Sequence, residues 1–412
     1  MGKLGKYSFG TGDRFGKEGK AQLKAVLKMM DLGVEVTPVW NKSNREHETV
    51  GTTAANTRKE ADLAVKSLSY TGAYLVDADH INLKTVDPYI PVSDFFTIDV
   101  ADFIGKEAPE DEKKAFLQFF SKYTNGIEIE GIASKIDISE ARLEDMLNNF
   151  LFAMKKAGGV YQHIKTKKPE DFYTEVSIDE VAEPQSPVEL LFILAALAFY
   201  EVPLNTIAPK FTGEFNKGID YRGDLKQFEK EFEEDLLVLK FAIKEFGLPE
   251  NLKLSVHSGS DKFSIYPVMQ KLISKHNTGL HLKTAGTTWL EELIGLAESE
   301  GEAFNFAKQI YAEALERYEE LTKDYISVLS IDREKLPAAD SFNNGNEFAN
   351  ALRHDQKSDA YNANFRQLIH CAYKIAAEKE DFSELLVKHR DKIEENVTYN
   401  LFERHLKPLF SE

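Results

Sequence analysis

The sequence alternates short apolar runs with longer amphipathic stretches, and this alternation restricts the possible folds more than any other feature. Eight runs have the length and composition of strands, at residues 6–10, 34–40, 73–78, 95–100, 172–178, 204–211, 252–257 and 279–284. Helices between successive strands imply parallel strands joined by crossovers. Eight such strands favour a closed barrel over an open doubly wound sheet. We therefore predict an α/β fold, a (β/α)8 TIM-type barrel.

The clearest helix is expected over residues 225–246. Apolar residues recur there at spacings of three and four: Leu225, Phe228, Phe232, Leu236, Leu239, Ile243 and Phe246. Gly247 and Pro249 follow directly, and a glycine and then a proline are typical of a helix C-terminus.

Two further regions depart from a plain barrel. Residues 107–170 are too many for a simple crossover, and we predict a helical insertion there, within a barrel formed by residues 1–290. Residues 291–412 are expected to form a mainly helical C-terminal extension packed on the barrel, with 326–332 as a candidate extra strand. No Gly-x-Gly-x-x-Gly motif follows the first strand, which excludes the usual dinucleotide-binding loop.

Charge and composition exclude several classes of protein. A formal net charge of −17 argues against a nucleic-acid or anionic-membrane partner, because such partners require a basic surface. The single cysteine, Cys371, excludes an internal disulfide and suits a reducing compartment. No apolar run resembles a signal peptide, and the longest one, 190–200, is too short to span a bilayer. We expect a soluble cytoplasmic protein.

Polar and titratable residues gather where the predicted strands end. They are Asp13, Arg14, Asp77, Asp79, His80, Glu175, Asp179, Glu180, Lys210, His257, Ser258, Ser260, Asp261, Lys262, His281 and Lys283. Most have a structural explanation when taken singly; "TTWLEE", for example, reads as a capping box from Thr288 to Glu291. Three histidines at the ends of different strands, each with carboxylates nearby, are harder to explain in this way. In a barrel these ends form the active face.

His80, His257 and His281 are therefore candidate ligands of one divalent metal ion. Neutral imidazole suits Zn, Mn, Fe, Co or Ni, and an open coordination position would let the ion polarise a carbonyl. Metal-free chemistry is the alternative, because histidine also acts as a general base.

Several longer motifs resemble those of the bacterial tagaturonate/fructuronate epimerase family. They are "SFGTGDRFG", "DADH", "EVSIDE", "TIAPKFTGEFNKGIDYRGD", "LSVHSGSDKFSIYP", "HLKTAGTTWLEELIGLA" and "LRHDQ". The resemblance implies a metal-dependent epimerase that interconverts D-tagaturonate and D-fructuronate in hexuronate catabolism, with a small hexuronate keto acid as substrate.

The resemblance also implies roles for individual residues. His80, His257 and His281 fall in motifs that look like the metal-binding positions of the family. Asp79 looks like the proton acceptor and Glu175 like the proton donor, with Glu214 and Asp220 in reserve for the second role.

The two keto acids differ at a hydroxyl-bearing carbon β to the ketone, so deprotonation next to the ketone does not by itself invert that centre. We hypothesise a retro-aldol route. A base takes the proton of the β-hydroxyl, the carbon–carbon bond breaks, the metal stabilises the enediolate, and the bond re-forms on the other face of the aldehyde. Loss and readdition of water is the rival route.

The carboxylate of the substrate requires cations or hydrogen-bond donors. The candidates are Arg14, Lys210, Ser258, Lys262, Lys283, Thr287 and Thr288. Arg353 and His354 either fold over the barrel mouth or pack as structure. Two other functions stay open, namely another metal-dependent sugar-acid aldolase, isomerase or dehydratase, and a non-catalytic sugar-acid binding protein.

Overall fold

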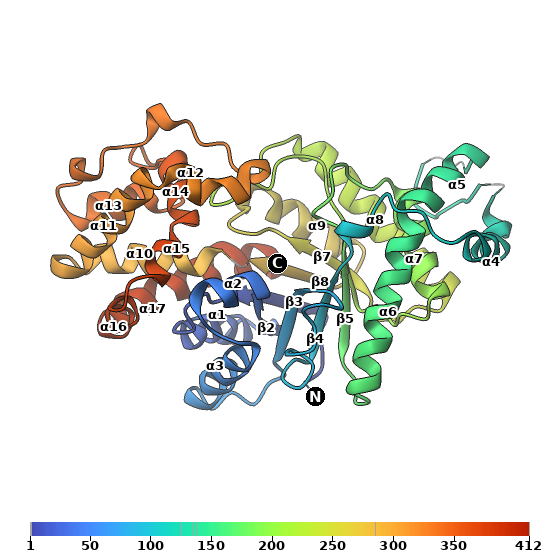
Figure 1. The fold of residues 1–412 in the computed structure, drawn as a ribbon, viewed down its shortest axis with the longest axis horizontal. Helices are drawn as coiled ribbons and strands as arrows, with labels where there is room; N and C mark the ends of the chain where they lie inside the picture. Colours follow the sequence, from blue (N-terminus) through green and yellow to red (C-terminus); the bar gives the residue numbers. More distant parts are fainter. Residues whose placement is uncertain (1, 125, 134, 137, 285, 412) are drawn as a thin grey trace.

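The computed structural model describes residues 2–411 apart from 125, 134, 137 and 285. Eight strands close into a barrel in sequence order (Figure 1). They are β1 (Tyr7–Gly12), β2 (Val36–Ser43), β3 (Leu75–Ile81), β4 (Phe95–Asp99), β5 (Tyr173–Ser177), β6 (Thr206–Ala208), β7 (Lys253–His257) and β8 (Leu280–Thr284). Each overlaps one of the eight predicted runs, so the predicted barrel is confirmed.

All neighbouring strands are parallel, and β8 closes on β1 with Tyr7 opposite Leu280 and Thr11 opposite Thr284. The carboxyl ends of all eight strands therefore meet at one end of the barrel. This is the end at which TIM barrels carry their active sites.

Helices surround the strands. Those that lead from one strand towards the next are α1 (Gly19–Asp31), α2 (Asn44–Val50), α3 (Ala54–Ser67), α6 (Phe152–Lys167), α7 (Pro187–Phe199), α8 (Leu225–Phe246) and α9 (Tyr266–Lys275). The predicted helix 225–246 is confirmed, and Gly247 ends it in the left-handed conformation at φ 67°. A residue with a Cβ is strained there, which explains the glycine.

The segment between β4 and β5 is helical, as predicted, and covers α7. It contains α4 (Glu110–Phe120) and α5 (Glu140–Met146) before α6, at the right of Figure 1. Phe116 and Phe120 of α4 contact Phe192 of α7, with ring centroids 4.9 and 5.6 Å apart. The apolar run at 190–200 is thus a helix buried among other helices. Among the described residues, no helix is long and apolar enough to cross a membrane.

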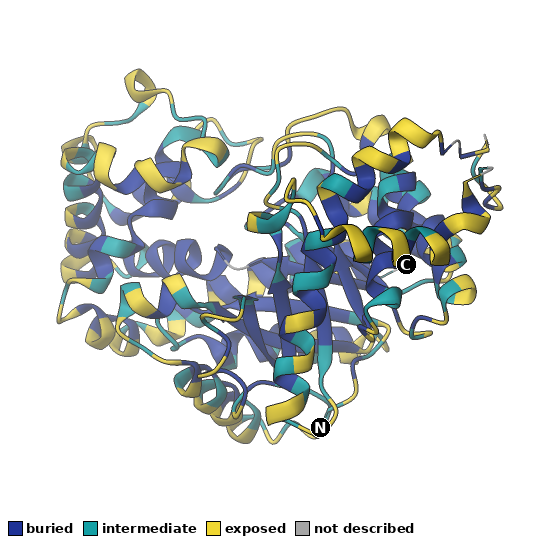
Figure 2. Cartoon of the chain, turned by 45° about the vertical axis from the view of Figure 1, so that its right-hand side comes forward, coloured by how far each residue is buried: buried dark blue, intermediate teal, exposed yellow. Residues whose placement is uncertain are grey.

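The C-terminal extension packs along one side of the barrel, at the left of Figure 1. Its helices are α10 (Thr287–Glu298), α11 (Gly301–Glu316), α12 (Tyr318–Thr322), α13 (Gly345–Leu352), α14 (Ala363–Cys371), α15 (Tyr373–Ala377), α16 (Phe382–Lys388), α17 (Arg390–Tyr399) and α18 (Lys407–Phe410). α17 packs on α10 and α1, and α18 packs on α9. Figure 2 shows the buried inner faces of these helices.

The candidate strand at 326–332 is wrong. A 3₁₀ helix covers Lys323–Val328, and residues 329–332 belong to no sheet. The physical reason is the closed barrel, which has no free edge with which another strand could pair.

The inside of the barrel is polar towards the carboxyl ends of the strands, whereas Leu4, Val39, Leu75 and Phe95 form a separate apolar cluster. Hydrogen bonds cross it between strands that are not neighbours, such as Lys283 of β8 to Asp77 of β3 at 2.9 Å. Barrel interiors are usually filled by branched apolar side chains. Polar groups buried there cost free energy unless they are paired, so a polar interior indicates a functional site.

Candidate active site

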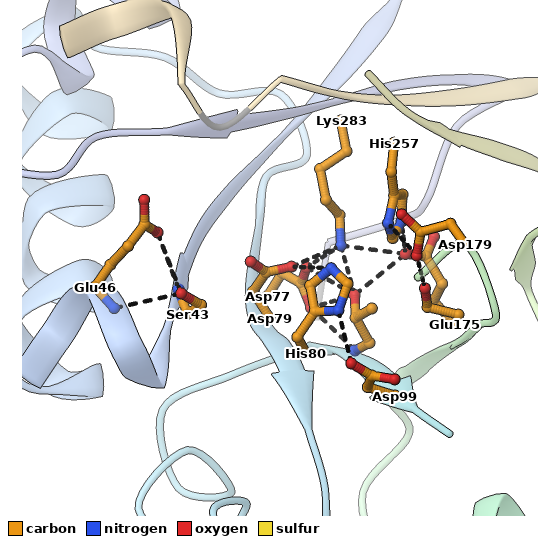
Figure 3. A network of polar contacts seen from close by, with 12 residues as sticks. Ser43, Glu46, Asp77, Asp79, His80, Asp99, Glu175, Asp179, His257 and Lys283 are labelled. Atoms are coloured by element: carbon orange, nitrogen blue, oxygen red, sulfur yellow. Dashed lines mark hydrogen bonds and ion pairs between the residues drawn. The ribbon is translucent and has the colours of Figure 1, made fainter. Parts of the chain in front are cut away.

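Lys283 lies at the centre of a cluster of carboxylates (Figure 3). Its Nζ is 2.9 Å from Asp77 Oδ2, 2.9 Å from Asp79 Oδ1 and 3.1 Å from Glu175 Oε1, and it donates a hydrogen bond to Thr97 Oγ1 at 2.7 Å. Burial lowers the pKa of Lys283, but the three carboxylates outweigh burial and hold that pKa well above its usual value. Lys283 is therefore a fixed positive charge at the carboxyl end of the barrel.

His257 and His80 lie beside this cluster, with ring centroids 5.3 Å apart. His257 Nε2 is 2.7 Å from Glu175 Oε1, and its Nδ1 is 3.2 Å from Asp179 Oδ1. His80 Nδ1 is 3.1 Å from Asp99 Oδ2. Each imidazole thus has a ring nitrogen within hydrogen-bond distance of a carboxylate from another strand, Glu175 of β5 for His257 and Asp99 of β4 for His80.

The backbone at His80 is unusual. His80 has φ 49°, a left-handed conformation that residues with a side chain rarely adopt, and the pairing of β3 with β4 is irregular between Ala78 and Ile81. Strained backbone of this kind is concentrated at functional sites.

The two imidazoles are held in a negative environment. Burial lowers the pKa of each, but Asp79 and Asp99 raise that of His80 to about 10, and Asp179 raises that of His257 to about 9. Such an environment equally favours a bound cation.

Among the described residues, one group has the spacing of a metal site. Ligand atoms of His80, Asp179 and His257 all lie within 4.8 Å of one another. Asp179 follows the end of β5 by two residues, and Ser177 Oγ donates a hydrogen bond to it. Two imidazoles and one carboxylate form a donor set common for divalent transition metals.

The structure does not bring His281, the third histidine of the predicted set, into this group. His281 lies two residues before Lys283 on β8, fully buried, with Nδ1 2.8 Å from Ser8 Oγ. Burial lowers its pKa to about 3, so its ring is neutral. Its Nε2 has no hydrogen-bond partner among the described residues. Asp179 is the third residue close to His80 and His257.

The predicted acid–base residues, Asp79 and Glu175, are both in the cluster. Glu175 is fully buried and also accepts a hydrogen bond from Thr206 Oγ1 at 2.7 Å. Burial raises the pKa values of Asp79 and Glu175, but Lys283 and the histidines more than offset it and lower both. Both carboxylates are therefore ionised at neutral pH.

The reserve candidates lie outside the cluster, in the loop between β6 and α8. Glu214 is exposed and accepts a hydrogen bond from Asn216. Asp220 accepts hydrogen bonds from the backbone N–H and the hydroxyl of Ser264. These contacts give both residues structural roles in their loop.

Most of the predicted substrate-binding residues already have partners within the protein. Lys210 donates to the carbonyls of Val181 and Ala182, Lys262 to those of Asn216 and Ile219, and Ser258 Oγ to that of Lys283; Thr287 Oγ1 donates to Asp261, Thr288 Oγ1 accepts from Gln22, and Arg14 pairs with Glu46. Lys262, Ser258, Thr287 and Thr288 are almost completely buried. These contacts fix loops around the site and leave few free donors for a ligand.

Arg353 and His354 pack as structure. Arg353 pairs with Glu298, and His354 Nδ1 is 3.1 Å from the fully buried Asp261. Asp261 lies four residues after His257, so the extension supports the loop that follows β7.

A cavity of about 540 Å³ adjoins the cluster. Asp99, which holds His80, and Glu180, which follows Asp179, both line it. Its other lining residues are Asn82, Ala101, Asp102, Phe103, Ile104, Val181 and Ala182. A ligand of sugar size fits in this volume.

Three comparisons relate the chain to known proteins. A family model described as tagaturonate epimerase matches residues 2–409. A tagaturonate/fructuronate epimerase of Thermotoga maritima is 31% identical over 414 residues, which cover 97% of this chain and 79% of that protein. A glycerol-complexed crystal structure of fructuronate-tagaturonate epimerase from Cohnella laeviribosi superposes with a TM-score of 0.82 at 25% identity, covering 99% of this chain and 82% of that one. The native structure of the Cohnella protein has the same TM-score at 24% identity.

Proposed function

The chain belongs to the tagaturonate epimerase family, and on that premise we propose that it interconverts D-tagaturonate and D-fructuronate with a divalent metal ion held by His80, Asp179 and His257. The observation that carries this proposal is the pair of imidazoles beside the Lys283 carboxylate cluster, at the carboxyl end of the barrel. Reaction at that end is the rule for this fold.

The donor set fits a metal ion in two respects. First, each histidine directs one ring nitrogen to an orienting carboxylate, Glu175 for His257 and Asp99 for His80, and its other nitrogen towards the shared space. This is the usual arrangement of a metal-binding histidine. Second, the carboxylates at this end outnumber the single lysine, so a further cation balances the charge. When bound, a divalent cation supplies a Lewis acid that stabilises negative charge on substrate oxygens.

The residues of the chain supply the proton transfers. Asp79, kept ionised by Lys283, is the candidate to accept the proton of the β-hydroxyl. Glu175 is also ionised, so it does not carry the returning proton by itself. The proton is instead shared between Glu175 Oε1 and His257 Nε2, 2.7 Å apart. A base and an acid that both contact Lys283 suit a retro-aldol route, in which their roles exchange in the reverse direction.

We expect the purified protein to convert tagaturonate to fructuronate, and removal of metal to reduce turnover at least about 100-fold. NMR of the products and elemental analysis before and after chelation measure both. Restoration by one of Zn, Mn, Fe, Co or Ni would identify the ion.

Other products would indicate other functions. Three-carbon fragments would indicate an aldolase, and a deoxy keto acid would indicate a dehydratase. Tight binding without turnover would indicate a sugar-acid binding protein. Undiminished turnover by protein proven free of metal would contradict the metal site.

The route is tested by isotopes. A retro-aldol reaction keeps the hydrogen on the carbon between the ketone and the inverted centre, provided that the cleaved intermediate does not exchange with solvent. In D₂O, we therefore expect less than one deuterium per epimerisation at that carbon. We also expect isotope label to be exchanged between the trapped fragments of substrate molecules that are labelled in different halves. Stoichiometric deuterium at that carbon without scrambling would favour loss and readdition of water.

A further inference from the structure

Three cations, Arg45, Lys217 and Lys374, lie over one tyrosine ring at the mouth of the barrel, outside the cluster described above. The side chains of Arg45, at the start of α2, and Lys217, in the loop after β6, lie 5.3 and 5.4 Å from the ring centroid of Tyr325. We call these three residues the Tyr325 cation group. The backbone N–H of Lys217 donates to the carbonyl of Val328 at 2.9 Å, which joins the loop after β6 to the 3₁₀ helix that carries Tyr325.

Neither cation of the group has a carboxylate within ion-pair distance among the described residues. Other cations nearby are paired: Lys374, over the same ring, with Asp324 at 2.8 Å, and Arg14 with Glu46 at 3.0 Å. Burial lowers the pKa of Lys217, and the charges of Arg45 and Arg14 lower it further. Unpaired like charges kept close together in a chain of net charge −17 indicate a site for an anion.

The group opens onto the same end of the barrel as the candidate metal ligands. Arg45 follows Ser43 by two residues, and Ser43 is the register partner of Asp79 (Figure 3). Burial lowers the pKa of Arg45, but Tyr325, Tyr373 and Glu180 outweigh burial and raise it. Glu180 lines the cavity and follows Asp179 in the chain. The two cations and the candidate metal ligands therefore lie at the same end of the barrel.

We propose that Arg45 and Lys217 bind the carboxylate of the sugar-acid substrate and thereby select an acid over a neutral sugar. This inference rests on the proposed function, which supplies an anionic substrate. It also supplies cations for the substrate carboxylate. The lysines predicted for that role, Lys210, Lys262 and Lys283, already donate to groups of the protein. Arg45 is exposed and Lys217 half-buried, so both are open to an incoming ligand.

The test compares an acid with a neutral ligand. In the double variant Arg45→Met/Lys217→Met, we expect KM for tagaturonate to rise at least about 100-fold with kcat within about fivefold, since a hydrogen bond to a charged group is worth roughly 10- to 100-fold in affinity. The advantage of tagaturonate over the neutral ketose tagatose in kcat/KM should fall by a similar factor. Lys217→Arg keeps the charge, and its KM for tagaturonate should stay within about tenfold of that of the parent.

Lys374→Met is the matched control. It removes a third cation from the same ring, but one that Asp324 already neutralises, and we expect KM unchanged. A double variant that retains the parent's preference for the acid would overturn the inference, as would equal losses in the control.

Binding of galactonate, a sugar acid without a ketone, separates this inference from the proposed function. If the parent does not epimerise tagaturonate, the proposed function is wrong. Calorimetry with galactonate then decides the inference: binding lost in the double variant supports it, and unchanged binding contradicts it.

Discussion

Replacing His257 with asparagine is expected to lower kcat/KM about 10³-fold while the protein stays folded. The variant removes an imidazole that pairs with Glu175 at 2.7 Å and belongs to the candidate metal group. Loss of a positioned acid–base group alone costs about 10²–10⁴-fold. Steady-state kinetics, circular dichroism and elemental analysis of the same preparation measure activity, fold and metal content together.

His276→Asn is the matched control for this variant. His276 also pairs with a glutamate at 2.7 Å, Glu233, but at the end of α9 on the outside of the barrel. We expect its activity and metal content to equal those of the parent. Activity of His257→Asn within tenfold of the parent would exclude His257 from the reaction.

His281→Asn distinguishes the two possible ligand sets. The structure pairs His281 with Ser8, below the cluster, so we expect the variant to keep its metal content. Metal loss as complete as in His257→Asn would instead support the three histidines predicted from sequence.

The barrel could be predicted from sequence because each strand has a local signal. Apolar runs and the spacing of residues such as Phe228 and Phe232 depend only on near neighbours in the chain, and these runs became the strands and α8. The position of the site followed from the fold, since carboxyl ends of strands converge.

The third member of the candidate metal group, Asp179, could not be predicted, because its position depends on depth in the barrel and on loop conformation. Alternation places His281 and Lys283 on the same inner face of β8, but it does not say which lies at the level of His257. The register shows that Lys283 is opposite His257. Asp179 lies beyond the end of β5, where the loop decides its direction.

The contacts of the lysines assigned to the substrate could not be predicted for a different reason. Lys262 is buried by contacts that depend on long-range packing, such as those to the carbonyls of Asn216 and Ile219. Its neighbour Asp261 pairs with Arg366, more than a hundred residues later in the chain. No local pattern shows such a pairing.

That pairing gives the largest expected effect on stability. Arg366 and Asp261 are both fully buried, with Nη2 2.7 Å from Oδ2, and Arg366 also donates to the carbonyls of Gly218 and Leu352. Arg366→Met leaves a buried carboxylate without its guanidinium, so we expect the free energy of unfolding to fall by about 3–5 kcal/mol. Urea unfolding measures the change.

Arg317→Met is the control. Arg317 pairs with three glutamates, Glu313, Glu320 and Glu378, but on the surface, and we expect a loss of about 1 kcal/mol or less. Equal losses in Arg366→Met and Arg317→Met would contradict the role of the buried pair. Asp261→Asn added to Arg366→Met should recover part of the loss, because it removes the unpaired charge.

The pH dependence of this loss has a definite sign. Burial raises the pKa of Asp261, but Arg366, His354 and His405 outweigh it and hold that pKa well below its usual value. The stabilisation is therefore fully present above the unfolded pKa of about 3.9 and is lost as the pH falls through the lower folded value. Without Arg366, burial raises the pKa of Asp261, and the variant binds a proton on folding. The difference in the free energy of unfolding between parent and variant should thus become smaller from pH 7 to pH 5. A difference that becomes larger over this range would contradict the assignment of the charge to Asp261.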